Sequence, residues 1–155
     1  KEAKGSECGR EGHGQVQMAW RGVKEGGVRA GSRAGMVDVY RALDEHWGHW
    51  GGAGLEGESV VPILEGRTAI VKEGAFTQHP RAAYFTGAPD AMGRSVRTVR
   101  YRYTEWRDFK TGKVIATELY DHEKDPLETV NIAGLPSSAA VLAECKARYR
   151  EGFAP

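Results

Sequence analysis

Short apolar and β-branched runs alternate with polar turns in the second half of the chain. Residues 95–98 and 101–107 are rich in β-branched and aromatic residues, which favour extended strands. The dipeptide Thr111-Gly112 is typical of a turn and precedes a third run, residues 113–120. Because turns this short join neighbouring strands, we expect an antiparallel sheet.

A final helix is predicted after Pro136, where Ser137 or Ser138 could cap the first free amide groups. Its apolar residues share one face and are Val141, Leu142, Cys145 and Tyr149. Gly152 is expected to end it. A sheet with one apolar face needs a cover, so we expect this helix to pack on the sheet. The polar stretch 121–131 between them predicts a loop.

Another helix is predicted over residues 36–47, followed by a stop signal at Gly48. The apolar residues that recur at helical spacing are Met36, Tyr40, Leu43 and Trp47. We expect this stripe, Trp47 included, to be buried. Residues 55–64 are predicted to form loop and turn, because Pro62 limits any strand there. Residues 67–74 are predicted to form a buried strand.

The first 35 residues hold nine glycines and little apolar periodicity. Within them, residues 16–20 are predicted to form a short buried strand. The chain therefore divides into an irregular segment, 1–35, and a folded part, 36–155. We expect the α+β class: a small antiparallel sheet of about four strands packed against a C-terminal helix, preceded by the glycine-rich segment and one helix.

Length and charge narrow the range of functions. The chain has 155 residues, enough for one domain, and a formal net charge of +1, so no overall field favours nucleic acid as a partner. No apolar run approaches the roughly 18 residues of a membrane span. The start at Lys1, without Met or a signal segment, is typical of a processed product or a fragment. Cys8 and Cys145 are expected to be separate thiols, with a disulfide as the alternative.

Three stretches occur in an order typical of one enzyme family. The first is Val37-Asp38-Val39-Tyr40 with Leu43, then Leu55-Glu56-Gly57-Glu58-Ser59 and Pro62-Ile63-Leu64, similar to V-D-x-Y-P-T-L followed by L-x-G-x-S-L-x-P-L-L. The second is Ala75-Phe76-Thr77-Gln78-His79-Pro80-Arg81, similar to A-x-S-Q-Y-P-R.

The third stretch completes the series. It reads Met92-Gly93-Arg94-Ser95-Val96-Arg97-Thr98, Tyr101-Arg102-Tyr103-Thr104-Glu105-Trp106, Glu118-Leu119-Tyr120-Asp121, and Asp125-Pro126-Leu127-Glu128 up to Asn131. It is similar to M-G-Y-S-x-R-T, Y-R-Y-T-x-W, E-L-Y-D and D-P-L-E-x-x-N. Taken together, residues 36–131 resemble the C-terminal part of type I sulfatases of the iduronate-sulfatase-like group, which hydrolyse sulfuric esters.

The chain departs from this pattern at three positions. Arg41 stands where the family has the proline of the first helix, so we expect that helix to continue without a kink. His79 replaces the tyrosine before Pro-Arg, and Arg94 replaces the tyrosine after Met-Gly. We therefore expect the sugar specificity to differ from that of an iduronate enzyme.

The resemblance implies a catalytic apparatus that this chain does not carry. The family uses a formylglycine, made from cysteine within C-x-[PA]-S-R, and a Ca²⁺ ion held by oxygen ligands. Cys8 precedes Gly-Arg-Glu-Gly, and Cys145 precedes Lys-Ala-Arg-Tyr, so neither cysteine fits the motif. We predict no catalytic residue, metal ligand or cofactor in this chain. The formylglycine and Ca²⁺ would belong to an N-terminal sulfatase domain, and without it the chain is expected to be inactive.

Four residues are candidates for substrate binding at the mouth of the complete enzyme's pocket: Gln78, His79, Arg81 and Arg94. The Arg81 guanidinium could bind a sulfate or a uronate carboxylate through two parallel hydrogen bonds. The alternative is that Arg81 makes an internal ion pair. Trp50, between glycines, is a candidate platform for a sugar ring, whereas Trp106 is expected to be half-buried in the sheet. The family implies a periplasmic, extracellular or lysosomal location.

Basic residues concentrate in the segment 94–113. They are Arg94, Arg97, Arg100, Arg102, Arg107, Lys110 and Lys113. The segment could bind a polyanion, which gives the alternative function of a free-standing polyanion-binding module. The competing interpretation is a sheet face whose charge is balanced by Glu118, Asp121, Glu123, Asp125 and Glu128. A truncated gene product without a function of its own is the third hypothesis.

Overall fold

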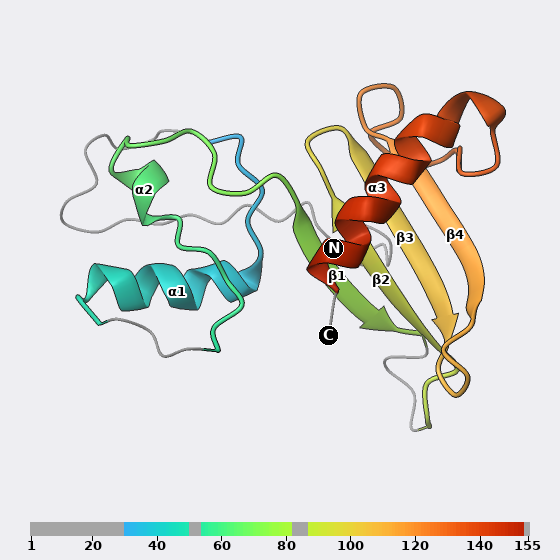
Figure 1. The fold of residues 1–155 in the computed structure, drawn as a ribbon, viewed down its shortest axis with the longest axis horizontal. Coiled ribbons are helices and arrows are strands. Elements are labelled where there is room, and N and C mark those ends of the chain that lie inside the picture. Colours follow the sequence, from blue (N-terminus) through green and yellow to red (C-terminus); the bar gives the residue numbers. More distant parts are fainter. Residues whose placement is uncertain (1–29, 50–53, 82–86, 154–155) are drawn as a thin grey trace, which may run out of the picture.

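The computed structural model describes residues 30–49, 54–81 and 87–153 of the chain. Its elements are α1 (Met36–His46), α2 (Val61–Leu64), β1 (Ala75–Pro80), β2 (Ala91–Arg97), β3 (Tyr101–Asp108), β4 (Val114–Asp121), the 3₁₀ turn η1 (Pro136–Ser138) and α3 (Ala139–Gly152). Figure 1 shows α1 and α2 to one side of the sheet, with α3 lying across it. Within the described residues, no helix is both long and apolar enough to span a membrane.

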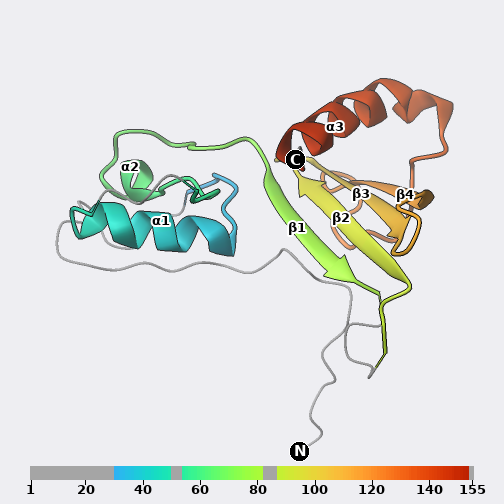
Figure 2. The same cartoon turned by 60° about the horizontal axis from the view of Figure 1, so that its bottom comes forward.

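The four strands form one antiparallel sheet in the order β1-β2-β3-β4, so each strand pairs with its neighbour in sequence. Gly112, with φ of +68°, lies in the predicted turn between β3 and β4. The α3 helix covers one face of the sheet (Figure 2). The predicted α+β fold, with its sheet and covering C-terminal helix, is confirmed.

The core lies between the sheet and α3. It consists of Val96, Tyr103, Leu119, Cys145 and Tyr149, with Val141 and Leu142 packed beside it. The Tyr103 and Tyr149 rings meet edge to face at 5.6 Å, a favourable aromatic geometry. Burial raises the pKa of the free Cys145 thiol to about 11, so this cysteine packs as an apolar residue. The predicted inner face of the final helix is therefore correct.

The start of α3 differs from the prediction in its capping. Ser138 occupies the N-cap position, but no side-chain hydrogen bond caps the helix. Its backbone amide instead donates to the Leu135 carbonyl at 3.0 Å, within the tight turn η1. A 3₁₀ turn satisfies some of the free groups that a serine hydroxyl would otherwise serve.

The strand predicted over residues 67–74 is wrong. The Thr68 hydroxyl donates to the Ile70 carbonyl at 2.9 Å and accepts from the Ile70 amide at 3.3 Å. These local bonds fold the segment into a bend instead of a ladder, and the Ile70 side chain is 53% exposed. The first strand of the sheet starts later, at Ala75.

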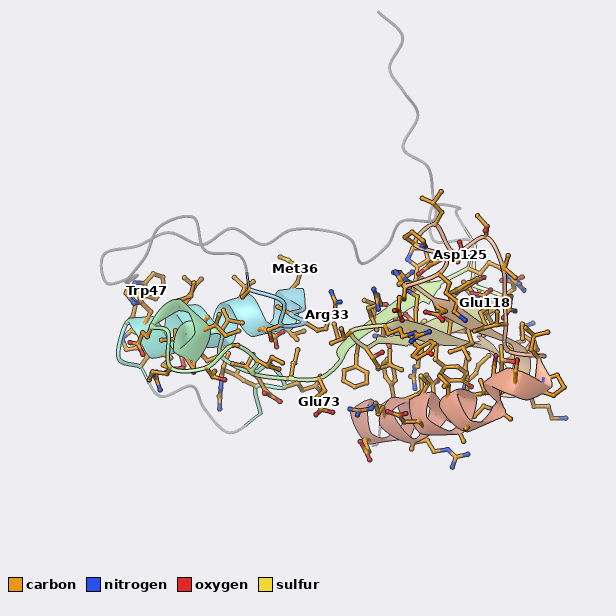
Figure 3. All side chains as sticks on the ribbon, turned by 90° about the horizontal axis from the view of Figure 1, so that it is seen from above. Arg33, Met36, Trp47, Glu73, Glu118 and Asp125 are labelled. Atoms are coloured by element: carbon orange, nitrogen blue, oxygen red, sulfur yellow. The ribbon has the colours of Figure 1, made fainter. Side chains whose placement is uncertain are left out.

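The buried stripe predicted for the first helix is also wrong, although α1 itself is present. Met36, Tyr40 and Trp47 are 78%, 62% and 66% exposed, and Figure 3 shows Met36 and Trp47 at the surface of the helical part. The buried positions of α1 are instead Asp38 and Ala42. Ala42 packs with Val60 and Val61 in a small second cluster, because the short α2 faces that side of α1. Three of the four stripe residues therefore point away from the neighbours that the structure describes, whereas Leu43 is half-buried.

Candidate functional site

The β1–β2 ladder carries three of the four predicted substrate-binding residues. Gln78 lies opposite Arg94, and His79 lies opposite Gly93. The Arg94 guanidinium sits over the Phe153 ring at 5.3 Å, which places Arg94 and its partner Gln78 on the face covered by α3. His79 lies on the opposite face, because neighbouring residues of a strand alternate. The sheet thus separates His79 from the Gln78–Arg94 pair.

Arg81 follows β1 and forms a two-pronged ion pair with Asp90. Its Nε donates to Oδ1 and its Nη2 to Oδ2, both at 2.9 Å, and its backbone amide donates to the Ala91 carbonyl at 2.8 Å. The hydrogen bond from Arg81 lowers the pKa of the exposed Asp90 carboxyl. The Arg81 fork is therefore occupied by an internal carboxylate, and the four residues do not converge on one pocket.

Three arginines of the basic segment are paired with carboxylates. The pairs are Arg100–Asp121 at 2.7 Å, Arg102–Glu128 at 3.1 Å and Arg107–Glu105 at 2.6 Å. Two of the acidic partners, Asp121 and Glu128, were predicted from the sequence, and Glu105 was not. The pairing with Arg100 lowers the pKa of Asp121, which holds this carboxyl in its charged form.

A sheltered polar network lies on the face of the sheet away from α3. Glu128 accepts hydrogen bonds from Arg102 at 3.1 Å and from the His122 Nε2 at 2.5 Å. Burial, together with the positive charge of Arg97, lowers the pKa of His122, whereas the hydrogen bond to Glu128 opposes this shift. This network joins the loop after β4 to the start of β3.

Asn131 closes the outer edge of β4. Its Oδ1 accepts from the Leu119 amide at 3.0 Å, and its Nδ2 donates to the Thr117 carbonyl at 3.1 Å. One side-chain amide thus replaces a peptide group of an adjoining strand. The Asp125 carboxylate accepts a hydrogen bond from the Val130 amide at 2.8 Å, which fixes the backbone immediately before Asn131. The D-P-L-E-x-x-N stretch therefore has a structural role, which its spacing alone did not predict.

Asp38 joins the two halves of the first family-like stretch. Its side chain is 1% exposed and accepts from the Gly35 amide at 2.5 Å and from the Glu58 amide at 2.9 Å. Lys72 Nζ forms an ion pair with it at 2.5 Å. A Cβ on Gly57 would lie 2.2 Å from the Val37 carbonyl oxygen, so only glycine permits this close approach. The shared motif residues hold the α1 region together.

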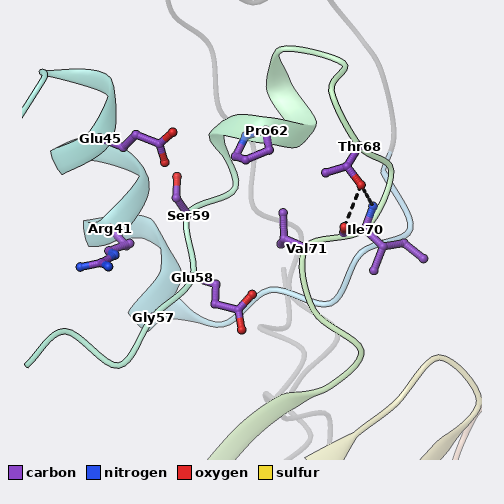
Figure 4. A pocket seen from close by; sticks show the side chains of 9 residues that line it. All are labelled: Arg41, Glu45, Gly57, Glu58, Ser59, Pro62, Thr68, Ile70 and Val71. Atoms are coloured by element: carbon purple, nitrogen blue, oxygen red, sulfur yellow. Dashed lines mark hydrogen bonds between the residues drawn. The ribbon is translucent and has the colours of Figure 1, made fainter. Parts of the chain in front are cut away.

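An open groove of about 450 Å³ lies beside α1 (Figure 4). Its lining residues are Arg41, Glu45, Gly57, Glu58, Ser59, Pro62, Thr68, Ile70 and Val71. The Ser59 hydroxyl accepts from the Val61 amide at 3.2 Å, which fixes it as a turn-forming group at the start of α2. Within residues 30–49, 54–81 and 87–153, no three His, Cys, Asp or Glu side chains are grouped to hold a metal ion.

Several sequence predictions fall outside the described residues. They concern Trp50 as a sugar platform, Cys8, the strand over residues 16–20, and most of the segment 1–35. Trp106, in contrast, is half-buried in β3 as predicted, and its Nε1 donates to Glu118 at 3.0 Å.

Comparison with known proteins gives no match to a family model and none to a curated protein. Solved structures do match. A protein of Bacteroides thetaiotaomicron assigned as a sulfatase is 29% identical, with a TM-score of 0.60 over 74% of this chain and 23% of its own. The phosphonate monoester hydrolase of Agrobacterium radiobacter is 25% identical, with a TM-score of 0.56 over 74% of this chain and 24% of its own.

A third structure is BT4656 in complex with its substrate D-glucosamine-2-N,6-O-disulfate. It is 21% identical, with a TM-score of 0.58 over 74% of this chain and 22% of its own. The chain thus spans about a quarter of the length of the structures it matches. Its sheet and final helix have the fold of the C-terminal part of sulfatase structures.

Proposed function

We propose that this chain is the C-terminal subdomain of a sulfuric ester hydrolase of the iduronate-sulfatase-like group that acts on sulfated sugars. The observation that carries the proposal is the overlap of 74% of the chain, at 29% identity, with a quarter of a protein assigned as a sulfatase. The sulfated glucosamine bound to BT4656 supports a sulfated sugar as the substrate class. The three family-like stretches of the sequence support the narrower group.

The part played by the chain in such an enzyme is structural. The motif residues Asp38, Gly57, Gly93 and Asn131 are engaged in hydrogen bonds or close packing within the fold. The formylglycine nucleophile and the Ca²⁺ ion are proposed to lie in the remaining three-quarters of the enzyme. Gln78 and Arg94 face one side of the sheet and His79 faces the other, so the enzyme's pocket would be lined either by the Gln78–Arg94 pair or by His79. Arg81 keeps the end of the β1–β2 hairpin closed through Asp90.

The exposed apolar stripe of α1 supports contact with the rest of the enzyme. Met36, Tyr40 and Trp47 would each lose exposed apolar surface in such a contact, which stabilises an interface by roughly 25 cal/mol per Å² buried. Apolar groups gathered on one exposed helix face are typical of a protein–protein contact. We therefore infer that α1 rests on the catalytic domain.

The coding sequence upstream of Lys1 provides the first test. We expect an open frame that encodes Cys-x-Pro-Ser-Arg or Cys-x-Ala-Ser-Arg. The longer product, purified with Ca²⁺, should release sulfate from D-glucosamine-2-N,6-O-disulfate or an aryl sulfate, and the 155-residue chain should release none. Sulfate release by the short chain, or an upstream frame without this motif, would contradict the proposal.

Substitutions in the stripe test the proposed interface. In the longer product, Tyr40→Ser combined with Trp47→Ser should lower the thermal midpoint, because water replaces an apolar contact. The same pair of changes should leave the 155-residue chain unaffected, since both side chains are already exposed. The matched control is Leu127→Ser, at a 69% exposed position on a loop of the sheet part. Equal midpoints for all longer products would argue against the contact.

The alternative function is a free-standing polyanion-binding module that uses residues 94–113. The ion pairs of Arg100, Arg102 and Arg107 weigh against it, because paired guanidinium groups offer less charge to a polyanion. Retention of the chain on heparin at low salt would favour this alternative if the substitution of Arg97, Arg100 and Arg102 by Ala abolished it.

A further inference from the structure

Two arginines from distant parts of the chain reach the same tight turn between β2 and β3. The Arg33 Nη2 donates to the Val99 carbonyl at 3.0 Å. The Arg97 Nη1 donates to the carbonyls of Thr98 and, at 3.4 Å, Tyr101. Figure 3 shows Arg33 between the helical part and the sheet. The junction of the two parts therefore holds two neighbouring guanidinium groups.

These guanidinium groups have no carboxylate partner among the described residues. The Arg33 Nε is buried and makes no hydrogen bond. Burial first, and then the charges of Arg33 and Arg102, lower the pKa of Arg97 to about 10, while the negative charge of Glu128 opposes this shift. The adjacent Glu128 carboxylate is already bonded to Arg102. The positive charges of Arg33, Arg97 and Arg102 thus exceed the single negative charge of Glu128 at this junction, an arrangement that a bound anion would complete.

We propose that Arg33 and Arg97 form a binding site for a doubly charged tetrahedral oxyanion, such as sulfate or phosphate, at the β2–β3 turn. Each guanidinium uses one terminal nitrogen on backbone carbonyls, so the other N–H groups are left to donate. A planar guanidinium group can donate two parallel hydrogen bonds to the oxygens of one oxyanion. The two positive charges of Arg33 and Arg97 match the two negative charges of the dianion. The inference does not depend on the proposed function.

The test uses the 155-residue chain and sodium sulfate as the probe. Ionic strength is held constant with sodium chloride, and the backbone amide signals of Thr98 and Val99 are followed by NMR. We expect saturable shifts with sulfate and with inorganic phosphate. Arg33→Gln and Arg97→Gln should each weaken sulfate binding at least tenfold. The matched control Lys113→Gln, an exposed cation of the same basic segment, should bind sulfate as the wild type does.

Three results would overturn the proposal. One is a shift that does not saturate, or that is equal in wild type and Arg33→Gln, because a general salt effect acts on every variant alike. Another is unchanged affinity in Arg33→Lys, which keeps the charge but loses the planar fork. The third is saturation by acetate but not by sulfate, which would assign the site to a carboxylate of a protein partner. Arg33 precedes α1 and lies outside the sheet, so its variants test the site even if Arg97→Gln does not fold.

Discussion

Gly93 lies directly opposite Trp106 in the β2–β3 ladder, and the indole ring fills the space that a side chain at residue 93 would need. A Cβ at this position would be 2.8 Å from the ring carbon Cζ3. The ring cannot easily move aside, because its Nε1 donates to Glu118 on β4. One glycine therefore permits an aromatic side chain to link three strands.

Gly93→Ala should lower the free energy of unfolding by about 2 kcal/mol, the range of overpacked core positions. Urea denaturation followed by circular dichroism measures the change. Gly134→Ala is the control, since no atom lies within 4 Å of the Cβ it would add. If the two variants unfold at the same urea concentration, the Trp106 ring does not restrict residue 93.

Asp38→Ala should loosen α1 selectively. The change leaves the amides of Gly35 and Glu58 without their acceptor and Lys72 without its partner, a loss of about 3 kcal/mol. Native-state hydrogen exchange should show about 100-fold faster exchange of the α1 amides. The control is Asp44→Ala, on the same helix, where the carboxylate Oδ2 makes no hydrogen bond. This change should alter the exchange rates of the α1 amides little. Equal effects of the two changes would contradict the role of Asp38.

Asn131→Ala should destabilise the β4 edge. Three hydrogen bonds depend on this side chain, from the amides of Leu119 and Ala133 and to the Thr117 carbonyl. At about 1 kcal/mol for each bond, reduced by solvent at this exposed edge, the expected loss is about 2 kcal/mol in urea denaturation. Asn131→Asp keeps Oδ1 but not the Nδ2 donor, so its loss should be smaller. A larger loss for Asp than for Ala would refute this account.

Acid should weaken the Arg100–Asp121 pair. Because the pKa of Asp121 is lower in the folded chain than in the unfolded chain, the pair stabilises the fold above about pH 4. This contribution is lost as pH falls through the lowered pKa. Free energies of unfolding measured from pH 7 to pH 3 should therefore fall more steeply in the wild type than in Asp121→Asn. Asp90→Asn, which removes an exposed pair, should follow the wild type closely.

Strands β3 and β4 and the end of β2 were predictable because they are rich in β-branched and aromatic residues and recognisable turns separate them. Strand β2 starts at Ala91, four residues before the predicted run 95–98. Strand β1 was missed because it is an edge strand whose residues show no regular alternation of burial. The strand predicted instead, residues 67–74, contains the apolar run Ala69-Ile70-Val71 but forms local hydrogen bonds. Periodicity located α1 but could not show which side of it meets the rest of the chain, because a carboxylate, Asp38, lies on the buried side.

The candidate site was predictable only in part. Charge balance across the basic segment indicated Asp121 and Glu128 as partners, and the structure pairs them with Arg100 and Arg102. The convergence of Arg33 and Arg97 depends on a contact between segments far apart in sequence, which no local pattern reveals. Likewise, the Arg81 fork could be assigned to Asp90 only once the β1–β2 hairpin was known.

The order of the core residues along the chain has a consequence for biosynthesis. Val96, Tyr103 and Leu119 leave the ribosome before Cys145 and Tyr149, which cover them. Until α3 has been translated, a nascent chain with all four strands carries an uncovered apolar face, the kind of surface that chaperones bind and that aggregates. Premature termination before Ala139 would make that transient state permanent.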